Sequence, residues 1–259
     1  MSHDDPARRL EQRLQALAAS LAARDDALGL LGLGSVGLET ARANAWSDLD
    51  FFVLVRSASK ARYLACLDWL AAAHPLAWTF ANTRDGYRAL MTDGLLCEFA
   101  VFEPQELADI PYAPGRWVWR REAEVPEAWA RPSLPLPGPR DPGWLIGEAL
   151  SNLLVGLLRW RRGERLAAMR MVQVHALDRV LELIDLQGPV TQTPQARRDP
   201  FSPDRRFEFR HPEHMPALRE CAAGIDATPR AARALLAQLE GLGAVPAPVA
   251  ARIHELAGP

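Results

Sequence analysis

A proline-rich stretch near the middle of the chain sets the strongest limit on its fold. Residues 131–142 read "RPSLPLPGPRDP". Because proline lacks a backbone donor and has a fixed φ, this stretch favours neither a helix nor a central strand. Strand patterns occur before it and almost vanish after Trp144. The sequence therefore predicts a first domain at 1–130, a linker at 131–142 and a second domain at 143–259.

The composition is that of a folded protein with mixed charge. The chain has 259 residues, of which 49% are hydrophobic and 24% charged, and its formal net charge is −2. This length supports two cores, and the charge balance gives no overall attraction to nucleic acid or to an anionic membrane. Lys60 is the single lysine, so a covalent mechanism through lysine is not expected. The other strongly basic side chains are arginines, which bind phosphate in a bidentate fork.

Cysteine usage and the N-terminal segment predict a cytoplasmic protein. Cys66, Cys97 and Cys221 are far apart and match neither a metal motif nor an even disulfide framework. The first 26 residues are charged and amphipathic and lack the apolar core of a signal peptide. No apolar run approaches the ~18 residues that a membrane span needs. We therefore expect a reducing compartment and no membrane partner.

The first domain has the patterns of a mixed sheet with flanking helices. A helix of about 20 residues begins at Pro6, where the first helical turn tolerates proline. A second helix is expected at 59–73, and Asp93-Gly94 between two apolar runs predicts a hairpin turn. Strands are predicted at 27–35, 49–55, 77–83, on both sides of the hairpin within 87–102, and at 115–125.

The second domain reads as an all-α helical bundle. Helices are predicted at 143–163, 165–187, 215–223, 227–241 and 246–258. Between them, residues 188–214 are polar and rich in proline and arginine, so they form either a mobile loop or a flap that contacts substrate. The predicted fold class is therefore α+β, a mixed sheet domain followed by a helical bundle.

Two aspartates stand at the start of the most apolar predicted strand. Asp48 and Asp50 precede and open the run "LDFFVLV". Side chains two residues apart on a strand point the same way, so both carboxylates project from one face within reach of a single ion. Mg²⁺ usually takes one or two protein carboxylates and completes its shell with water and phosphate oxygens. An acidic, solvent-exposed strand end is the alternative explanation for this pair.

A third carboxylate lies inside another apolar strand. Glu98 is the one charged residue of "LLCEFAVF" and requires a partner if it is buried. One interpretation pairs it with Arg88 across the hairpin. The other places Glu98 beside Asp48 and Asp50, where three carboxylates hold one or two metal ions.

Gly34-Ser35 ends the first predicted strand in a run rich in glycine. Glycine lets backbone amides turn outward into a concave anion site, and the serine adds a hydroxyl donor. A plain glycine turn between strands is the alternative. No Gly-Lys-Ser/Thr follows, so this is not a P-loop. The Gly-x-Gly-x-x-Gly match at 32–37 leads into a loop rather than a helix, so it does not predict a dinucleotide site.

Taken together, Gly34-Ser35, Asp48-Leu49-Asp50 and Glu98 resemble the signature of the nucleotidyltransferase superfamily with the polymerase-beta-like fold. The resemblance covers residues 28–103. A minimal catalytic domain followed by a helical bundle is most similar to the antibiotic nucleotidyltransferases, which adenylate aminoglycosides or lincosamides. The resemblance implies that Gly34 and Ser35 hold the triphosphate of ATP or another nucleotide. It also implies that Asp48 and Asp50 bind Mg²⁺ and that Glu98 is a third metal ligand or the general base.

Further residues are candidates for contacts with substrates. Ser47, next to Asp48, and the helical Arg159, Arg162 and Arg170 are candidates for binding the nucleotide; a solvated basic face paired with Glu164 is the alternative for the arginines. An acceptor pocket suited to a cation is expected to include Trp144, Glu148, Asp178 and Glu182, although core or surface roles are the simpler default. His211 and His214 lack a nearby carboxylate motif and are not expected to bind metal.

Three functional hypotheses follow. The first is a Mg²⁺-dependent enzyme that transfers AMP from ATP to a hydroxyl of a small molecule, releasing pyrophosphate. The second is an enzyme of the same superfamily that modifies RNA or a protein, as in a toxin and antitoxin pair, but the sequence has no basic and aromatic stripe for nucleic acid. The third is a nucleotide-binding module without catalysis, and against it stands the cost of keeping an idle cluster of like charges. The helical half is a candidate for a homodimer interface.

Overall fold

The computed structural model describes residues 6–133, 138, 140–188, 193, 196–199 and 201–258. The chain divides into two compact units, Met1–Leu136 and Pro137–Pro259. The division falls inside the predicted linker at 131–142, part of which lies outside the described residues. Within the described residues, none of the helices combines the length and apolarity of a membrane-spanning segment.

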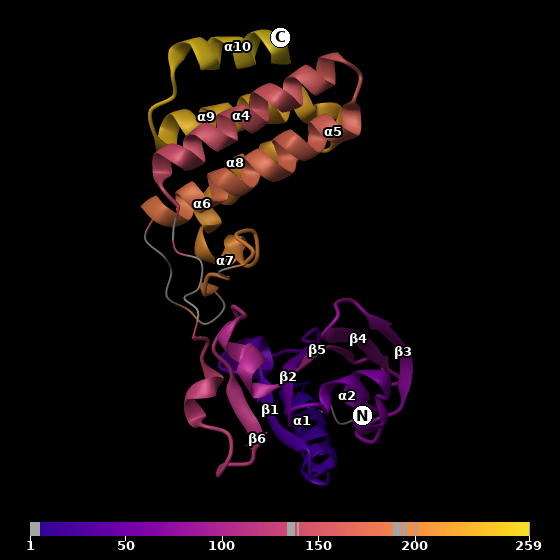
Figure 1. The fold of residues 1–259 in the computed structure, drawn as a ribbon. Coiled ribbons are helices and arrows are strands. Elements are labelled where there is room, and N and C mark those ends of the chain that lie inside the picture. Colours follow the sequence, from indigo (N-terminus) through magenta and orange to yellow (C-terminus); the bar gives the residue numbers. More distant parts are fainter. Residues whose placement is uncertain are drawn as a thin grey trace. The chain divides into compact units, whose positions relative to one another are not determined.

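The first unit is built on a six-stranded mixed sheet (Figure 1). Its strands lie in the order β3-β4-β5-β2-β1-β6, and among the described pairs only β2 and β5 run parallel. The predicted α+β fold class is confirmed. The strands are β1 (Ala27–Gly32), β2 (Leu49–Val55), β3 (Leu76–Ala81), β4 (Gly86–Met91), β5 (Leu96–Phe102) and β6 (Arg116–Arg120), and the α-helices are α1 (Pro6–Ala22), α2 (Lys60–Ala65) and α3 (Asp68–Ala71).

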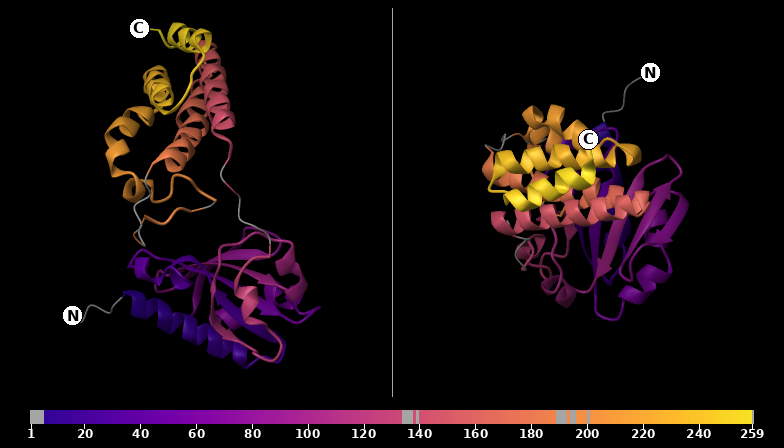
Figure 2. Two further views of the ribbon diagram at one scale, coloured as in Figure 1. Left: turned by 90° about the vertical axis from the view of Figure 1, so that its left-hand side faces the viewer. Right: turned by 90° about the horizontal axis from the view of Figure 1, so that it is seen from above.

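Alternation along the strands sends side chains into two separate cores. On one face, Phe51 and Phe99 are buried under α1, α2 and α3, and their rings stack with centroids 5.3 Å apart. Figure 2 shows α1 running alongside the sheet. On the other face, Leu54 and Phe102 pack with the segment after β5, including Tyr112. This second core covers only part of its face, because the residues at the start of β2 and β5 do not belong to it.

The prediction of one continuous helix at 59–73 is wrong, because the chain forms two helices, α2 and α3, with a break between them. Cys66 is extended, with φ −137° and ψ 113°. Tyr63 and Trp69 are both fully buried, and Trp69 Nε1 donates to the Tyr63 carbonyl at 3.1 Å. Six residues apart on one continuous helix, the two side chains would project about 120° from each other. The break lets both of them enter the same core.

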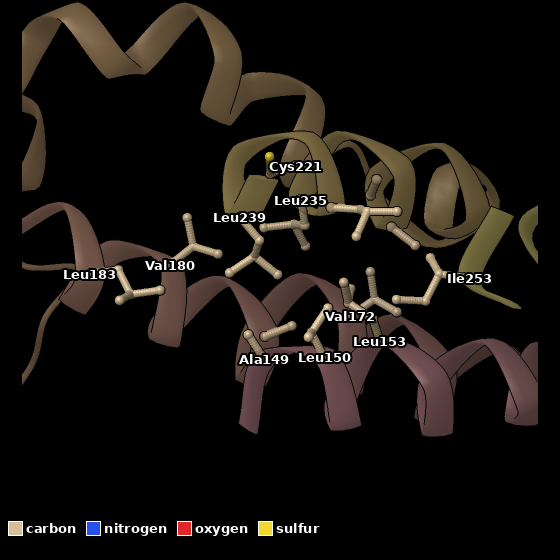
Figure 3. Close-up of a cluster of buried hydrophobic side chains, with 14 of the residues drawn as sticks. Ala149, Leu150, Leu153, Val172, Val180, Leu183, Cys221, Leu235, Leu239 and Ile253 are labelled. Atoms are coloured by element: carbon tan, nitrogen blue, oxygen red, sulfur yellow. The ribbon is translucent and has the colours of Figure 1, made fainter. Parts of the chain in front are cut away.

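The second unit is helical, as predicted, and has a core of its own (Figure 3). Leu153, Val172, Leu235 and Ile253 belong to this core, and α10 packs against both α4 and α9 (Figure 2). Its elements are α4 (Pro142–Arg161), α5 (Arg165–Arg170), a π-helical turn η5 (Met171–Ala176), α6 (Leu177–Gln187), α7 (Phe207–Arg210), α8 (Met215–Cys221), α9 (Thr228–Leu242) and α10 (Ala247–Ala257).

The segment predicted to be a loop or flap, 188–214, includes residues 189–192, 194, 195 and 200, which lie outside the described residues. Its end is anchored to α6. Arg210 is fully buried and donates through two nitrogens to Asp185, at 2.9 and 3.0 Å. His211 Nε2 lies 2.7 Å from the same carboxylate. His211 thus belongs to a buried ion-pair cluster.

Asp93, in the predicted hairpin turn, ties α1 to the sheet. Arg9 and Arg13 each approach its Oδ2 at 2.9 Å, and the Leu95 amide donates to Oδ1 at 3.3 Å. Partial burial alone would raise the pKa of Asp93, but these hydrogen bonds outweigh burial and lower the pKa to about 2. The ionised form therefore stabilises the fold.

We expect Asp93→Asn to lower the free energy of unfolding by about 2 kcal/mol at pH 7. The contribution is fully present above the ordinary pKa of 3.8 and is lost as pH falls toward 2, so the difference from wild type shrinks to about half at pH 3. Urea unfolding at both pH values measures this, with the exposed Glu122→Gln as control. An equal deficit at both pH values would contradict the assignment.

Candidate active site

Strand register brings two of the predicted carboxylates side by side. Asp50 on β2 is the parallel partner of Glu98 on β5, and Glu98 is in turn the antiparallel partner of Arg88 on β4. Arg88 pairs with Phe80 on the edge strand β3. Register partners project from the same face of a sheet. These four residues therefore form one row across four strands, on the part of the sheet that the second core leaves open.

Asp48 lies at the start of the same region. It is half-buried, like Asp50, and stands two residues before it at the mouth of β2. Burial raises the pKa of the Cys97 thiol to about 12, against the lowering effect of Arg13, and the negative charges of Asp93, Asp48 and Asp50 add to the rise. Both aspartates thus lie close enough to Cys97, on β5, for their charges to act on it.

Glu98 pairs with Arg88 on one side and is the register partner of Asp50 on the other. Its Oε1 accepts from Arg88 Nη2 at 3.2 Å and from Asn82 Nδ2 at 3.1 Å. Both hydrogen bonds reach the same oxygen, so among the described residues Oε2 has no partner. The glutamate side chain keeps 41% of its surface exposed. It is held by Arg88 and still stands beside Asp50 with one oxygen open to a ligand.

The Gly34-Ser35 turn follows β1 directly and lies against β2. The Leu33 amide donates to the Asp50 carbonyl at 2.8 Å, and Gly34 has a φ of +51°, which favours glycine. A Cβ at Gly34 would lie 3.5 Å from Asp50 Oδ2 and 2.9 Å from Arg42 Nη2. Glycine therefore keeps open a space bordered by a carboxylate and a guanidinium group. Ser35 is buried and lines a cavity of about 220 Å³ between this turn and α1.

The remaining nucleotide-binding candidates occupy other places. Ser47 Oγ accepts from the Asn44 amide at 3.0 Å, which closes the loop before Asp48. Arg159 and Arg162 are in the second unit. Arg162 donates to Glu164 at 2.8 Å, the surface pairing that we gave as the alternative for these arginines. Their binding of nucleotide stays a prediction.

The donors present fit a magnesium ion at Asp48 and Asp50. Two carboxylates at one strand mouth are the hard oxygen ligands that Mg²⁺ takes from proteins, and the space kept by Gly34 adjoins one of them. In the described part of the chain, no three acidic, histidine or cysteine side chains are gathered closely enough to hold one ion together. Glu98 is turned to Arg88 and Asn82, so its role as a metal ligand stays a prediction.

Arg42 and Asn82 are members of the site that the sequence did not single out. Arg42 pairs with Glu39 within the loop after Gly34. Asn82 directly follows the edge strand β3 and donates to Glu98. Neither belongs to a motif. The pairing of β3 with β4 and of β4 with β5 brings Asn82 to Glu98, and no local pattern in the sequence predicts this contact.

Among the predicted acceptor-pocket residues, Glu148 lines a polar cavity in the second unit. This cavity has a volume of about 310 Å³ and also contacts Asn152, His175 and Arg179. Glu182 borders the same region through its ion pair with Arg179 at 2.8 Å. Burial raises the pKa of Asp178, although Arg179 opposes that rise, and Trp144 lies under the guanidinium group of Arg140.

Comparisons with known proteins give only distant likenesses. No family model matches the chain, and none of the curated proteins matches it. Among solved structures, an aminoglycoside 6-adenyltransferase from Bacillus subtilis aligns over 95% of this chain and 90% of its own, with 12% identity and a TM-score of 0.33. A nucleotidyltransferase-like protein from Exiguobacterium sibiricum aligns over 89% and 74%, with 11% identity and a TM-score of 0.34. Because these TM-scores are low, the function proposed below is argued from the geometry of the site alone.

We expect Asp50→Asn to weaken binding of a divalent cation by about tenfold or more, because it removes one of two adjacent carboxylate ligands. Titration with Mn²⁺, followed by the electron paramagnetic resonance signal of the free ion, measures this. Asp109→Asn, which changes an exposed carboxylate elsewhere in the first unit, is the matched control and should bind as wild type does. Equal affinities in all three proteins would remove Asp50 from the metal site.

Proposed function

We propose that this protein is a nucleotidyltransferase that transfers AMP from ATP to a hydroxyl of a small molecule. The supporting observation is the register that sets Asp50 beside Glu98, with Asp48 and the Gly34 turn at the same end of the strands. Phosphoryl transfer requires carboxylates for a metal ion, a base for the acceptor hydroxyl and backbone donors for phosphate, and we assign these roles to Asp48 with Asp50, to Glu98 and to the Gly34 turn. All of them lie within the first unit.

In the proposed reaction the acceptor oxygen attacks the α-phosphorus of the nucleotide. A new phosphorus–oxygen bond forms, the bond from the α-phosphorus to the bridging oxygen breaks, and pyrophosphate leaves with its electrons. Glu98 accepts the hydroxyl proton at Oε2, while Arg88 and Asn82 hold its other oxygen in place. The backbone around Gly34 and Ser35 binds the departing phosphates. Mg²⁺ held by Asp48 and Asp50 would neutralise charge that develops on the phosphate oxygens.

The proposed partners are a nucleoside triphosphate and a hydroxyl compound of the aminoglycoside or lincosamide type. The carboxylates of the first unit, Asp48, Asp50 and Glu98, would favour an acceptor that carries positive charge.

The first test is pyrophosphate release in the presence of Mg²⁺ and each nucleoside triphosphate, across a panel of aminoglycosides and lincosamides. We expect release that depends on one nucleotide and one class of acceptor. Asp50→Asn and Glu98→Gln should each lower the rate by about 100-fold or more, and Asp109→Asn should not. Undiminished turnover in Asp50→Asn would refute the mechanism.

Gly34→Ala provides a test of the phosphate cradle. The new methyl group would enter the space beside Asp50 and force a left-handed φ on alanine, which costs about 1–2 kcal/mol, so binding of Mg²⁺-ATP should weaken by about tenfold. Gly94→Ala is the matched control: Gly94 has a φ of +85°, and a Cβ there has nothing within 4 Å. Calorimetric titration compares them. If both variants bind equally well, the Gly34 turn does not hold the phosphates.

A further inference from the structure

Two aromatic side chains are exposed on the edge strand of the first unit. Trp78 and Phe80 on β3 keep 50% and 54% of their surface exposed. Their rings stack, with centroids 5.9 Å apart and an angle of 15° between planes. Figure 1 shows β3 at the border of the sheet. An exposed aromatic pair on an edge strand promotes association with other chains. Such a patch often marks a binding surface, so we expect a ligand that fits it.

The pair belongs to the same face as the proposed catalytic residues. Phe80 pairs with Arg88, Arg88 with Glu98 and Glu98 with Asp50. Beside this charged row runs a second, apolar one, in which Trp78 pairs with Leu90 and Leu90 with Leu96. Leu96 is 37% exposed. An apolar strip therefore leads from the aromatic pair to the carboxylates.

The order of the strands in the sheet indicates which of the two substrates this apolar strip can contact. The Gly34 turn lies on the β1 side of Asp50, and the aromatic pair lies beyond Glu98 on the other side. In an in-line displacement the attacking oxygen and the leaving pyrophosphate occupy opposite sides of the phosphorus. If the phosphates bind at Gly34, the acceptor therefore approaches from the side of β5, β4 and β3.

We propose, on the basis of the proposed transfer reaction, that Trp78 and Phe80 form an acceptor platform for a glycoside of two or more linked rings. One ring presents its hydroxyl to Glu98, and a second ring lies with its C–H face on the aromatic pair. Phe80 and Glu98 are separated by two strand spacings, about 10 Å, which a single ring does not bridge. An ammonium group on the second ring would gain a cation–π contact with Trp78.

Arg88 does not oppose a cationic acceptor, because Glu98 neutralises it at 3.2 Å. In the row, Arg88 also lies between Phe80 and Glu98. It therefore acts as a positioning residue for Glu98. Its polar side chain also lies where the bond that links the two rings of the glycoside would pass.

The test is calorimetric binding of two-ring compounds, neamine and lincomycin, and of the one-ring 2-deoxystreptamine. We expect at least one two-ring compound to bind wild type more tightly than the single ring does. Trp78→Ala and Phe80→Ala should weaken that binding by about tenfold, and Trp78→Phe should restore most of it. Phe209→Ala, which removes an aromatic side chain 60% exposed in the second unit, is the matched control.

The same variants are titrated with a non-hydrolysable ATP analogue and Mg²⁺, which should bind them as it binds wild type. Weaker nucleotide binding in Trp78→Ala would assign the pair to the base and overturn the proposal. A change in the oligomeric mass of Trp78→Ala with unaltered glycoside binding would also overturn the proposal. Failure of both two-ring compounds to bind wild type would overturn it as well. Glycoside binding that depends on Trp78 without any pyrophosphate release would refute the transfer reaction and leave the platform standing.

Discussion

The parallel pairing of β2 with β5 is the constraint on which the first unit depends. Its register places Phe51 against Phe99 on the buried face and Asp50 against Glu98 on the open face. Because side chains alternate, a slip of one residue would turn the carboxylates toward the core and the aromatic rings toward water. Burying both rings is worth several kcal/mol, roughly 2–3 for each. The interaction that stabilises the sheet therefore also fixes the spacing of the site.

Glu98 shows how such a site persists in a folded protein. A carboxylate beside Asp50 is repelled by it, by roughly 3 kcal/mol for two charges 5 Å apart at an effective dielectric constant of 20. Arg88 and Asn82 offset this by binding one oxygen of Glu98. The second oxygen stays available. A partner on the neighbouring strand thus stabilises the glutamate without removing it from the open face.

Local patterns in the sequence predicted the elements well and their partners poorly. The hairpin at Asp93-Gly94 follows from turn chemistry, and Gly94 indeed has a φ of +85°. The break between α2 and α3 depends on Tyr63 and Trp69 meeting in one core, which no local pattern encodes. Likewise, the sequence left Arg88 and Asp50 as rival neighbours of Glu98. Only strand order shows that Glu98 lies between them.

The charge around the open face is a further reason to expect a divalent cation there. Arg42 pairs with Glu39, and Arg88 pairs with Glu98. Asp48 and Asp50 add two negative charges at the strand mouth. The repulsion between two carboxylates that stand two residues apart at the start of one strand falls when a doubly charged ion binds beside them. A divalent cation at this end of β2 would therefore depend on Asp48 and Asp50 as its protein ligands.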